Sequence, residues 1–210
     1  EYVRGSARVD VSDRRRGLRD SWLNLKFEDT ALVLEDDIVL SPRWYEWLTG
    51  AWERYGHRDD LAGITLQRQS LIPTVPPRYD AEIVNDHEPF LFPLPGSIGF
   101  SPHRERWNEF LEWIASVDLE RVDVSVPGVS ASRFVSDRSE AWTPYFVRFC
   151  ATHALSTLYV NLPNGETLAA HMRERGTHFP RRRGQDFALR VDKGGALEFP
   201  LEPPAKYDWD

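Results

Sequence analysis

The sequence predicts an α/β fold: a mostly parallel sheet with helices on both of its faces. Short apolar runs of strand length, Ala31–Leu34 and Leu61–Leu66, alternate with longer stretches whose apolar side chains recur at helical spacing. A run that is apolar at every position is typical of a strand covered on both faces, which favours a parallel sheet between two helix layers. We therefore expect Ala31–Leu34 to be the central strand, flanked by strands near Ala7–Val11 and Leu61–Leu66.

Three pairs of a hydroxyl residue and a proline mark expected helix starts: Ser41-Pro42, Ser101-Pro102 and Thr143-Pro144. The hydroxyl can cap the helix, and proline suits the first helical position because its missing N–H needs no partner there. After Ser41-Pro42, one apolar stripe runs from Trp44 to Tyr55. A fourth helix is expected after Asp13, which can cap it, and Ser156–Val160 has the composition of a strand.

The segment Leu71–Pro95 interrupts this alternation. It is rich in proline and shows no period, and proline at such density disfavours both central strands and regular helices. We expect an irregular segment in which Asp86-His87-Glu88 is a polar loop, with a place in an acceptor pocket as the alternative. Gly96 and Gly99, which follow, permit close backbone approach or an unusual φ angle, and a simple turn is the alternative there.

The composition describes a single domain over residues 1–210, with residues 184–210 as a peripheral C-terminal tail. A chain of 210 residues can bury a substantial core, and its eight tryptophans and eleven phenylalanines supply one. The net charge of −7 argues against a nucleic-acid partner, because such proteins normally carry a basic footprint. No apolar run approaches the ~18–20 residues of a transmembrane segment. The single cysteine, Cys150, cannot form an internal disulfide.

The chemistry is expected at Glu35-Asp36-Asp37, directly after the first apolar run. In open α/β sheets, ligands bind beyond the carboxyl ends of the strands. Three adjacent carboxylates raise one another's pKa unless a positive charge lies among them, and Mg²⁺ or Mn²⁺ prefers carboxylate oxygen. The alternative is a solvated acidic turn that stabilises the start of the next helix. The spacing alone leaves both interpretations open.

The residues around this triplet resemble a known motif. Val33-Leu34-Glu35-Asp36-Asp37-Ile38, followed by Ser41-Pro42-Arg43-Trp44-Tyr45, is similar to the Glu-Asp-Asp form of the DXD segment of GT-A-type glycosyltransferases, in particular the N-acetylglucosaminyltransferase I-like group. The resemblance implies a Rossmann-like GT-A fold and a nucleotide-diphospho-sugar transferase that uses Mn²⁺ or Mg²⁺. In that family the last acid of the triplet ligates the metal. The resemblance therefore implies Asp37 as the metal ligand, with Glu35 and Asp36 lining the donor pocket.

Two arginines are candidates for binding the donor diphosphate. Arg16 and Arg19 lie between Asp13, which can cap the expected helix, and the apolar stripe of that helix, and a helix N-terminus favours anions. In the resemblance, this helix belongs to the unit that precedes the acidic strand. The alternative is an exposed basic face, which is the usual fate of a charge run.

Candidates for a catalytic base and a second metal ligand lie later in the chain. In inverting GT-A enzymes, a carboxylate at a helix start takes the proton from the acceptor hydroxyl; Glu140 occupies the most similar position, and Asp137 is the runner-up. Both have the alternative role of acids that stabilise a helix start. Many GT-A enzymes also use a C-terminal histidine at the metal or leaving phosphate. His178 is preferred over His171 because Arg181-Arg182-Arg183 follow it, with an unpaired surface histidine as the alternative.

The resulting hypothesis is a glycosyltransferase that moves a sugar from a nucleotide-sugar donor, such as a UDP-sugar, to a hydroxyl of a glycan or other acceptor. GT-A domains begin with a further βα unit, and only about thirty residues precede the triplet, so that unit is expected to be missing here. Two alternatives stay open: a non-catalytic GT-A-like binding module and a metal-dependent phosphoester hydrolase. The resemblance is compatible with the Golgi lumen, whereas the sequence itself indicates no compartment.

Overall fold

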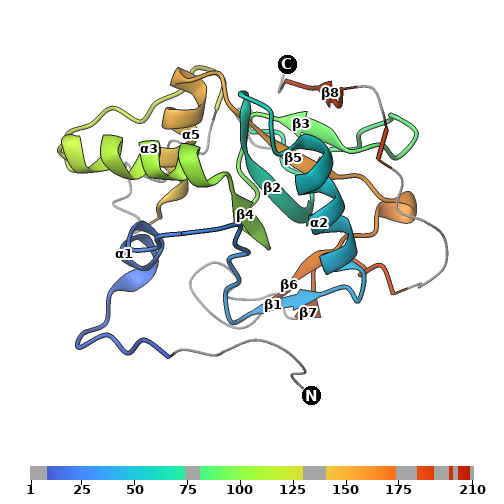
Figure 1. The fold of residues 1–210 in the computed structure, drawn as a ribbon, viewed down its shortest axis with the longest axis horizontal. Coiled ribbons are helices and arrows are strands. Elements are labelled where there is room, and N and C mark those ends of the chain that lie inside the picture. Colours follow the sequence, from blue (N-terminus) through green and yellow to red (C-terminus); the bar gives the residue numbers. More distant parts are fainter. Residues whose placement is uncertain are drawn as a thin grey trace.

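The computed structural model describes residues 9–73, 81–129, 141–173, 184–191, 199–200 and 203–208. The helices are α1 (Gly17–Leu23), α2 (Trp44–Tyr55), α3 (Arg104–Ser116) and α5 (Thr143–Thr152) (Figure 1). The strands are β1 (Ile38–Leu40), β2 (Leu61–Arg68), β3 (Phe90–Phe92), β4 (Phe100–Pro102), β5 (Ser156–Val160), β6 (Ala169–Arg173), β7 (Gly184–Gln185) and β8 (Ala205–Lys206). A short 3-10 helix, Pro163–Gly165, lies between β5 and β6.

The strands form two sheets. The larger sheet has the order β4-β2-β5-β3-β8, and the smaller has the order β1-β6-β7. In the larger sheet the β2·β5 and β3·β8 pairs are parallel, whereas the β2·β4 and β3·β5 pairs are antiparallel. The α/β class is thus confirmed, but the prediction of a mostly parallel sheet is wrong, because the sheet is mixed. An apolar run indicates that a strand is buried on both faces, but it does not indicate whether the strand is parallel or antiparallel to its neighbours.

The prediction that Ala31–Leu34 forms the central strand is also wrong. Its one ladder contact is an isolated antiparallel bridge from Val33 to Phe100 of β4, which places it beyond the edge of the larger sheet. Leu34 has 46% of its surface exposed. The central strand of the five is β5, which is buried throughout, and β2 beside it has its first six residues buried. No strand forms at Val9–Val11, and residues 1–8 lie outside the described residues.

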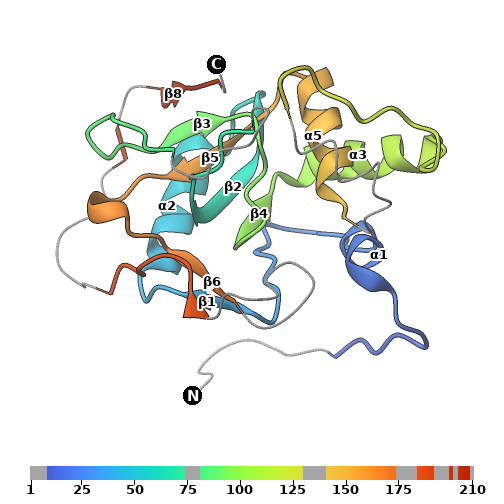
Figure 2. The same cartoon turned by 180° about the vertical axis from the view of Figure 1, so that it is seen from behind.

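Helices cover both faces of the larger sheet. α2 lies in front of the sheet in Figure 1 and behind it in Figure 2. Leu91 of β3 and Leu158 of β5 belong to the apolar cluster of α2, whereas the alternating residues Phe90 and Tyr159 pack with Val147 of α5. This alternation is the period-two pattern of side chains in a strand.

The second face carries a dense aromatic cluster. It joins α1, α3 and α5 through the fully or almost fully buried rings of Trp22, Trp107, Phe110, Trp142, Phe146 and Phe149. Ring centroids of neighbouring members lie 4.2 to 6.3 Å apart, within the range of favourable aromatic pairs. The aromatic content of the sequence is therefore concentrated on one side of the sheet.

The hydroxyl-proline pairs predict only one helix start correctly. Thr143-Pro144 opens α5 as expected. α2 begins at Trp44, two residues beyond Pro42, although the hydroxyl of Ser41 accepts a bond from the Arg43 N–H at 3.1 Å. Ser101-Pro102 lies in β4, because the hydroxyl of Ser101 bonds to tertiary partners instead of capping a helix.

The proline-rich segment contains a strand that the sequence analysis missed. β3 is fully buried and pairs with β5. Pro89 and Pro93 lie just outside its two ends, where proline does not interrupt the ladder of hydrogen bonds. Residues 74–80 of this segment lie outside the described residues.

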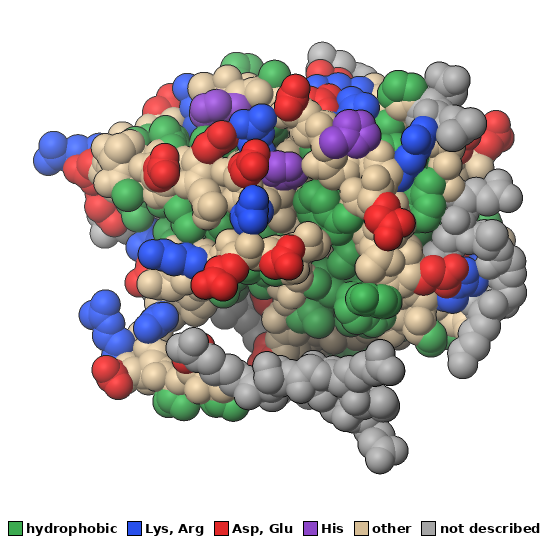
Figure 3. Space-filling model, in the orientation of Figure 1, with side chains coloured by type: hydrophobic (Ala, Val, Ile, Leu, Met, Phe, Trp, Pro, Cys, Tyr) green, Lys and Arg blue, Asp and Glu red, His purple; other side chains and the backbone are tan. Residues whose placement is uncertain are grey.

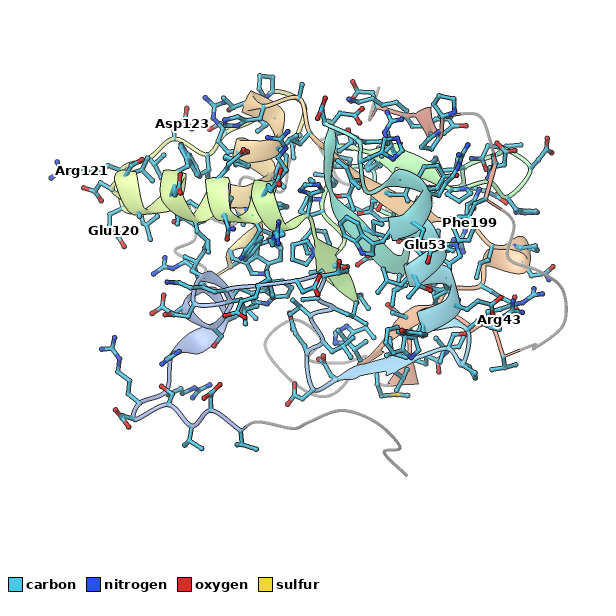
Figure 4. All side chains as sticks on the ribbon, in the orientation of Figure 1. Arg43, Glu53, Glu120, Arg121, Asp123 and Phe199 are labelled. Carbon is cyan, nitrogen blue, oxygen red and sulfur yellow. The ribbon has the colours of Figure 1, made fainter. Side chains whose placement is uncertain are left out.

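The described parts of the expected C-terminal tail add an edge strand to each sheet and place Phe199 against α2. β7 pairs with β6, and β8 pairs with β3. Phe199 lies beside α2, where its ring contacts Trp47 and Tyr55 (Figure 4). No helix among the residues that the structure describes is long and apolar enough to span a membrane.

Candidate functional site

The acidic triplet forms the link between the two sheets. Val33, just before it, bridges to β4 of the larger sheet, and Ile38, just after it, begins β1 of the smaller sheet. A turn connects them, in which the Ile38 N–H donates to the Glu35 carbonyl at 3.3 Å. Asp36 is exposed at this turn, whereas Glu35 and Asp37 are half-buried. Two of the three carboxylates therefore face the protein at the junction of the sheets.

Asp37 meets a histidine from the other end of the chain. The Nε2 atom of His171, on β6, lies 2.6 Å from Oδ2 of Asp37, and the two side chains are 17% and 34% exposed. The contact follows from the pairing of β1 with β6, in which Ile38 is opposite His171. The Met172 N–H also donates to the Asp37 carbonyl at 2.7 Å. The backbone thus holds the two side chains together across 134 residues of sequence.

Glu35 is held by the aromatic core. Its Oε1 accepts a hydrogen bond of 3.1 Å from the indole N–H of Trp22, on α1. Burial raises the pKa of Glu35 above its ordinary value, and the charges of Asp37 and Asp36 raise it further, whereas the Trp22 bond and His171 lower it. The junction therefore disfavours a full set of negative charges and favours a cation.

Asp186 positions the strand that carries His171. Its Oδ1 accepts bonds from the backbone N–H groups of His171, at 2.9 Å, and Phe187, at 2.8 Å. The Asp186 N–H in turn donates to the His171 carbonyl at 3.1 Å. Asp186 binds backbone groups, so its role is to fix β6 beside the triplet.

The segment before β4 that contains Gly96 and Gly99 packs closely against β2 and β6. Gly99 has a φ of +67°, and a Cβ at this position would lie 3.0 Å from the Ala169 side chain of β6. Gly96 approaches the Thr65 hydroxyl of β2 so closely that a Cβ would lie 2.6 Å from it. Both properties expected of these glycines, close approach and unusual φ, are therefore present.

The two arginines lie on α1 and at its start. Arg16 lines a hollow of about 260 Å³ with Asp13 and Asp20, and Arg19 lies 3.6 Å from the Asp20 carboxylate. Within the described part of the chain, neither forms an ion pair with the triplet. Their role in diphosphate binding stays a prediction.

Three of the residues singled out in the sequence lie outside the described residues: Asp137, Glu140 and His178. The structure instead brings His171 to Asp37, and Trp22 to Glu35. The sequence contains a signal for His171, because it ends an apolar run, Leu168–Ala170, just as the acidic triplet ends Ala31–Leu34. Trp22 and Asp186 carry no such signal, since their contacts depend on distant parts of the chain.

The donor set has the right chemistry for a single divalent cation. Ligand bonds of about 2.0–2.2 Å to carboxylate oxygen and imidazole nitrogen can reach Asp37 and His171 from one position. Mg²⁺ typically takes one or two protein carboxylates and leaves its other positions to water and phosphates. Among the described residues, no group of three or more His, Cys, Asp or Glu side chains could hold a metal ion. Metal binding at Asp37 and His171 therefore stays a prediction.

Charged side chains of both signs are mixed on the surface. On the face shown in Figure 3, the described acidic and basic side chains are interspersed, and they do not form a basic stripe. The absence of a nucleic-acid partner stays a prediction.

No protein-family model, curated protein or solved structure matches this chain.

Proposed function

We propose that this protein is a metal-dependent glycosyltransferase, which moves a sugar from a nucleotide-diphosphate donor to an acceptor hydroxyl. The observation that supports it most is the contact between Asp37 and His171. The resemblance implies that the last acid of the triplet ligates the metal and that a histidine from the C-terminal part of the chain joins it. His171 has both the position and the donor atom for that role.

The proposal assigns a task to each residue of the junction. Asp37 and His171 hold Mn²⁺ or Mg²⁺, which when bound neutralises the diphosphate and stabilises the departing nucleotide. Glu35, fixed by the Trp22 indole, lines the donor pocket and contributes to the negative field that attracts the ion. Asp36, which is exposed, is placed to contact the donor sugar or ribose. Glu140 or Asp137 accepts the proton of the acceptor hydroxyl.

Titration of Mn²⁺ and UDP into the protein tests this function. We expect UDP to raise the melting temperature strongly only when Mn²⁺ is present, because metal and diphosphate complete one site. His171→Gln and Asp37→Asn each remove one ligand and should abolish the coupling. His57→Gln, at an exposed histidine away from the triplet, is the matched control and should behave as the wild type. Equal coupling in the wild type and both ligand variants would contradict the assignment.

A non-catalytic binding module is the second candidate. It is favoured by the small donor set, since the described residues bring only one histidine to the triplet and Arg19 pairs with Asp20 on α1. A phosphoester hydrolase with two metals would need a second cluster of ligands, and the described residues contain none. Mn²⁺-coupled UDP binding together with no release of UDP from any UDP-sugar would favour the module over the enzyme.

A further inference from the structure

A second pocket lies at the carboxyl ends of the two parallel strands in the middle of the larger sheet. β2 ends at Arg68 and β5 ends at Val160, and both residues line a pocket of about 120 Å³. Its other polar lining residues are Gln69, Glu82, His87, Asn161 and Asn164. Ligands of open α/β sheets bind beyond the carboxyl ends of parallel strands. The position of this pocket is therefore that of a binding site, and none of its residues belongs to the triplet site.

Arg68 is held at this pocket by contacts other than an ion pair. Its guanidinium lies 5.4 Å from the centroid of the Phe187 ring, and its backbone N–H donates to the Thr167 hydroxyl at 3.0 Å. A Cβ at residue 165 would lie 2.5 Å from its Nη1 atom, so the guanidinium rests against the backbone of Gly165. No carboxylate of the described residues forms an ion pair with it, although the chain carries a net charge of −7. A half-buried cation is thus fixed in place with its hydrogen-bond donors available.

Two tight turns contribute to the lining of the pocket. In one, Asp86 and His87 have φ of 55° and 65°, and the Glu88 N–H donates to the Asn85 carbonyl. In the other, Asn164 and Gly165 have φ of 59° and 66°. Left-handed residues other than glycine are uncommon and cluster at functional sites, and three of the four in the described chain lie in these two turns.

Asn161 joins one of these turns to β5. Its amide donates to the Ile83 carbonyl at 3.0 Å and to Oδ1 of Asn85 at 2.5 Å. These bonds use both amide hydrogens, so Asn161 holds the turn in place. The amide of Asn164 and the ring of His87 remain beside Arg68 as further groups lining the pocket.

We propose that this pocket binds an oxyanion, namely the carboxylate or phosphate group of a small ligand, with Arg68 as the principal donor. Arginine presents a planar fork of donors that matches both groups, and bonds between charged partners are among the strongest. The small volume admits one such group and a few neighbouring atoms. Glu82, which is exposed at the mouth, can accept a hydrogen bond from a hydroxyl beside the anion. A ligand with a hydroxyl next to its anionic group therefore fits best.

Three probes that share one carbon skeleton test this proposal: glycerol 3-phosphate, glycerate and neutral glycerol. Each is titrated at constant ionic strength, with a chelator present so that the triplet site holds no metal, while amide chemical shifts are followed by NMR. We expect saturable shifts at Gly165 and His87 with one or both anions and none with glycerol. The anion that saturates at the lower concentration identifies the source of the oxyanion. Equal shifts with glycerol would overturn the proposal, because the site would then recognise hydroxyls alone.

Variants locate the binding. Arg68→Gln should weaken anion binding by about tenfold or more, because it removes a charge-assisted contact. Asn164→Asp keeps a residue that tolerates left-handed backbone and adds a repelling charge, so it should also weaken binding without affecting the fold. Arg58→Gln, at the other end of β2 in a pair with Asp60, is the matched control and should bind as the wild type. Unchanged binding in both pocket variants would overturn the proposal.

The same titration separates this pocket from the proposed donor site. Asp37→Asn is expected to leave anion binding unchanged, since Asp37 does not line the pocket. Loss of binding in that variant would place the anion at the triplet and overturn the second site. A failure of Mn²⁺-coupled UDP binding, by contrast, would leave this result untouched.

Discussion

The aromatic core and the acidic junction lie side by side and differ in almost every physical respect. The core beneath α3 and α5 is closed, apolar and built of interlocking rings, whereas the junction is half-open and carries three carboxylates against one histidine. They share one residue: Trp22 stacks on Trp142, with ring centroids 4.2 Å apart, and donates its indole N–H to Glu35. The core thus supplies a rigid wall for a site whose own charges repel one another.

This difference separates what stabilises the fold from what is available for binding. Burying large apolar surface contributes most of the stability, whereas a cluster of like charges opposes folding until a cation joins it. Changes in the core should therefore act on stability, and changes at the junction should act on ion binding. Four substitutions test this division, in order of decreasing effect.

Trp142→Ala should have the largest effect. Trp142 is 1% exposed and contacts the rings of Trp22, Phe100, Trp107 and Phe146, so truncation leaves a cavity in the core. We expect the free energy of unfolding to fall by about 3–5 kcal/mol, measured by chemical denaturation. Tyr45→Ala, at a residue that is 63% exposed, is the control and should change it by about 0.5 kcal/mol or less. A loss below about 1 kcal/mol in Trp142→Ala would show that the core is loosely packed.

Trp22→Phe tests the shared residue. An aromatic ring is kept, but the smaller phenyl group loses the hydrogen bond to Glu35 and leaves part of the indole's buried space empty, so we expect a loss of about 1–3 kcal/mol. Because that bond lowers the pKa of Glu35, its removal should raise this pKa further, which a carboxyl ¹³C NMR titration can follow. Trp52→Phe removes a different indole bond, to the Ser101 hydroxyl, and should leave the Glu35 titration unchanged.

Glu35→Gln tests the acidic junction itself, because it removes one of the three negative charges there. Since the folded-state pKa of Glu35 is raised, the protonated form is favoured by folding, and the associated stability is lost as the pH rises through that pKa. Without metal, the glutamine variant should be more stable than the wild type at neutral pH. The difference should disappear below the ordinary pKa of 4.5, where both states of the wild type are protonated. Melting temperatures across this range in a chelating buffer provide the measurement, and a wild type that is more stable at neutral pH would contradict the expected sign.

Asp37→Asn should have the smallest effect on stability. The Asp37–His171 contact is partly exposed, such pairs contribute roughly 0–1 kcal/mol, and the asparagine oxygen can still accept a bond from the histidine ring. We expect the free energy of unfolding to change by about 1 kcal/mol or less, while the Mn²⁺-coupled response to UDP is lost. A large loss of stability with unchanged metal response would assign Asp37 a structural role.

Some features follow from local sequence alone. The stripe from Trp44 to Tyr55 becomes α2, Leu61–Leu66 becomes the start of β2, and Ser156–Val160 becomes β5. Each of these elements has a hydrophobic period or run that is long enough to be specific, and each buries the face that the pattern predicts. The triplet could be singled out for a comparable reason, because three adjacent acids after an apolar run are a local signal.

The tertiary structure decided where these elements lie and which side chains meet. Two similar apolar runs took opposite places. Leu61–Leu66 became part of β2, an interior strand, whereas Ala31–Leu34 lies beyond the edge strand β4 with one described bridge, since burial depends on the partners that each strand finds. Likewise, no local pattern could select His171 as the partner of Asp37, because their contact requires β6 to return to β1 in one register. Local sequence determines the period of an element, whereas strand direction, register and long-range contacts depend on the packing of the whole chain.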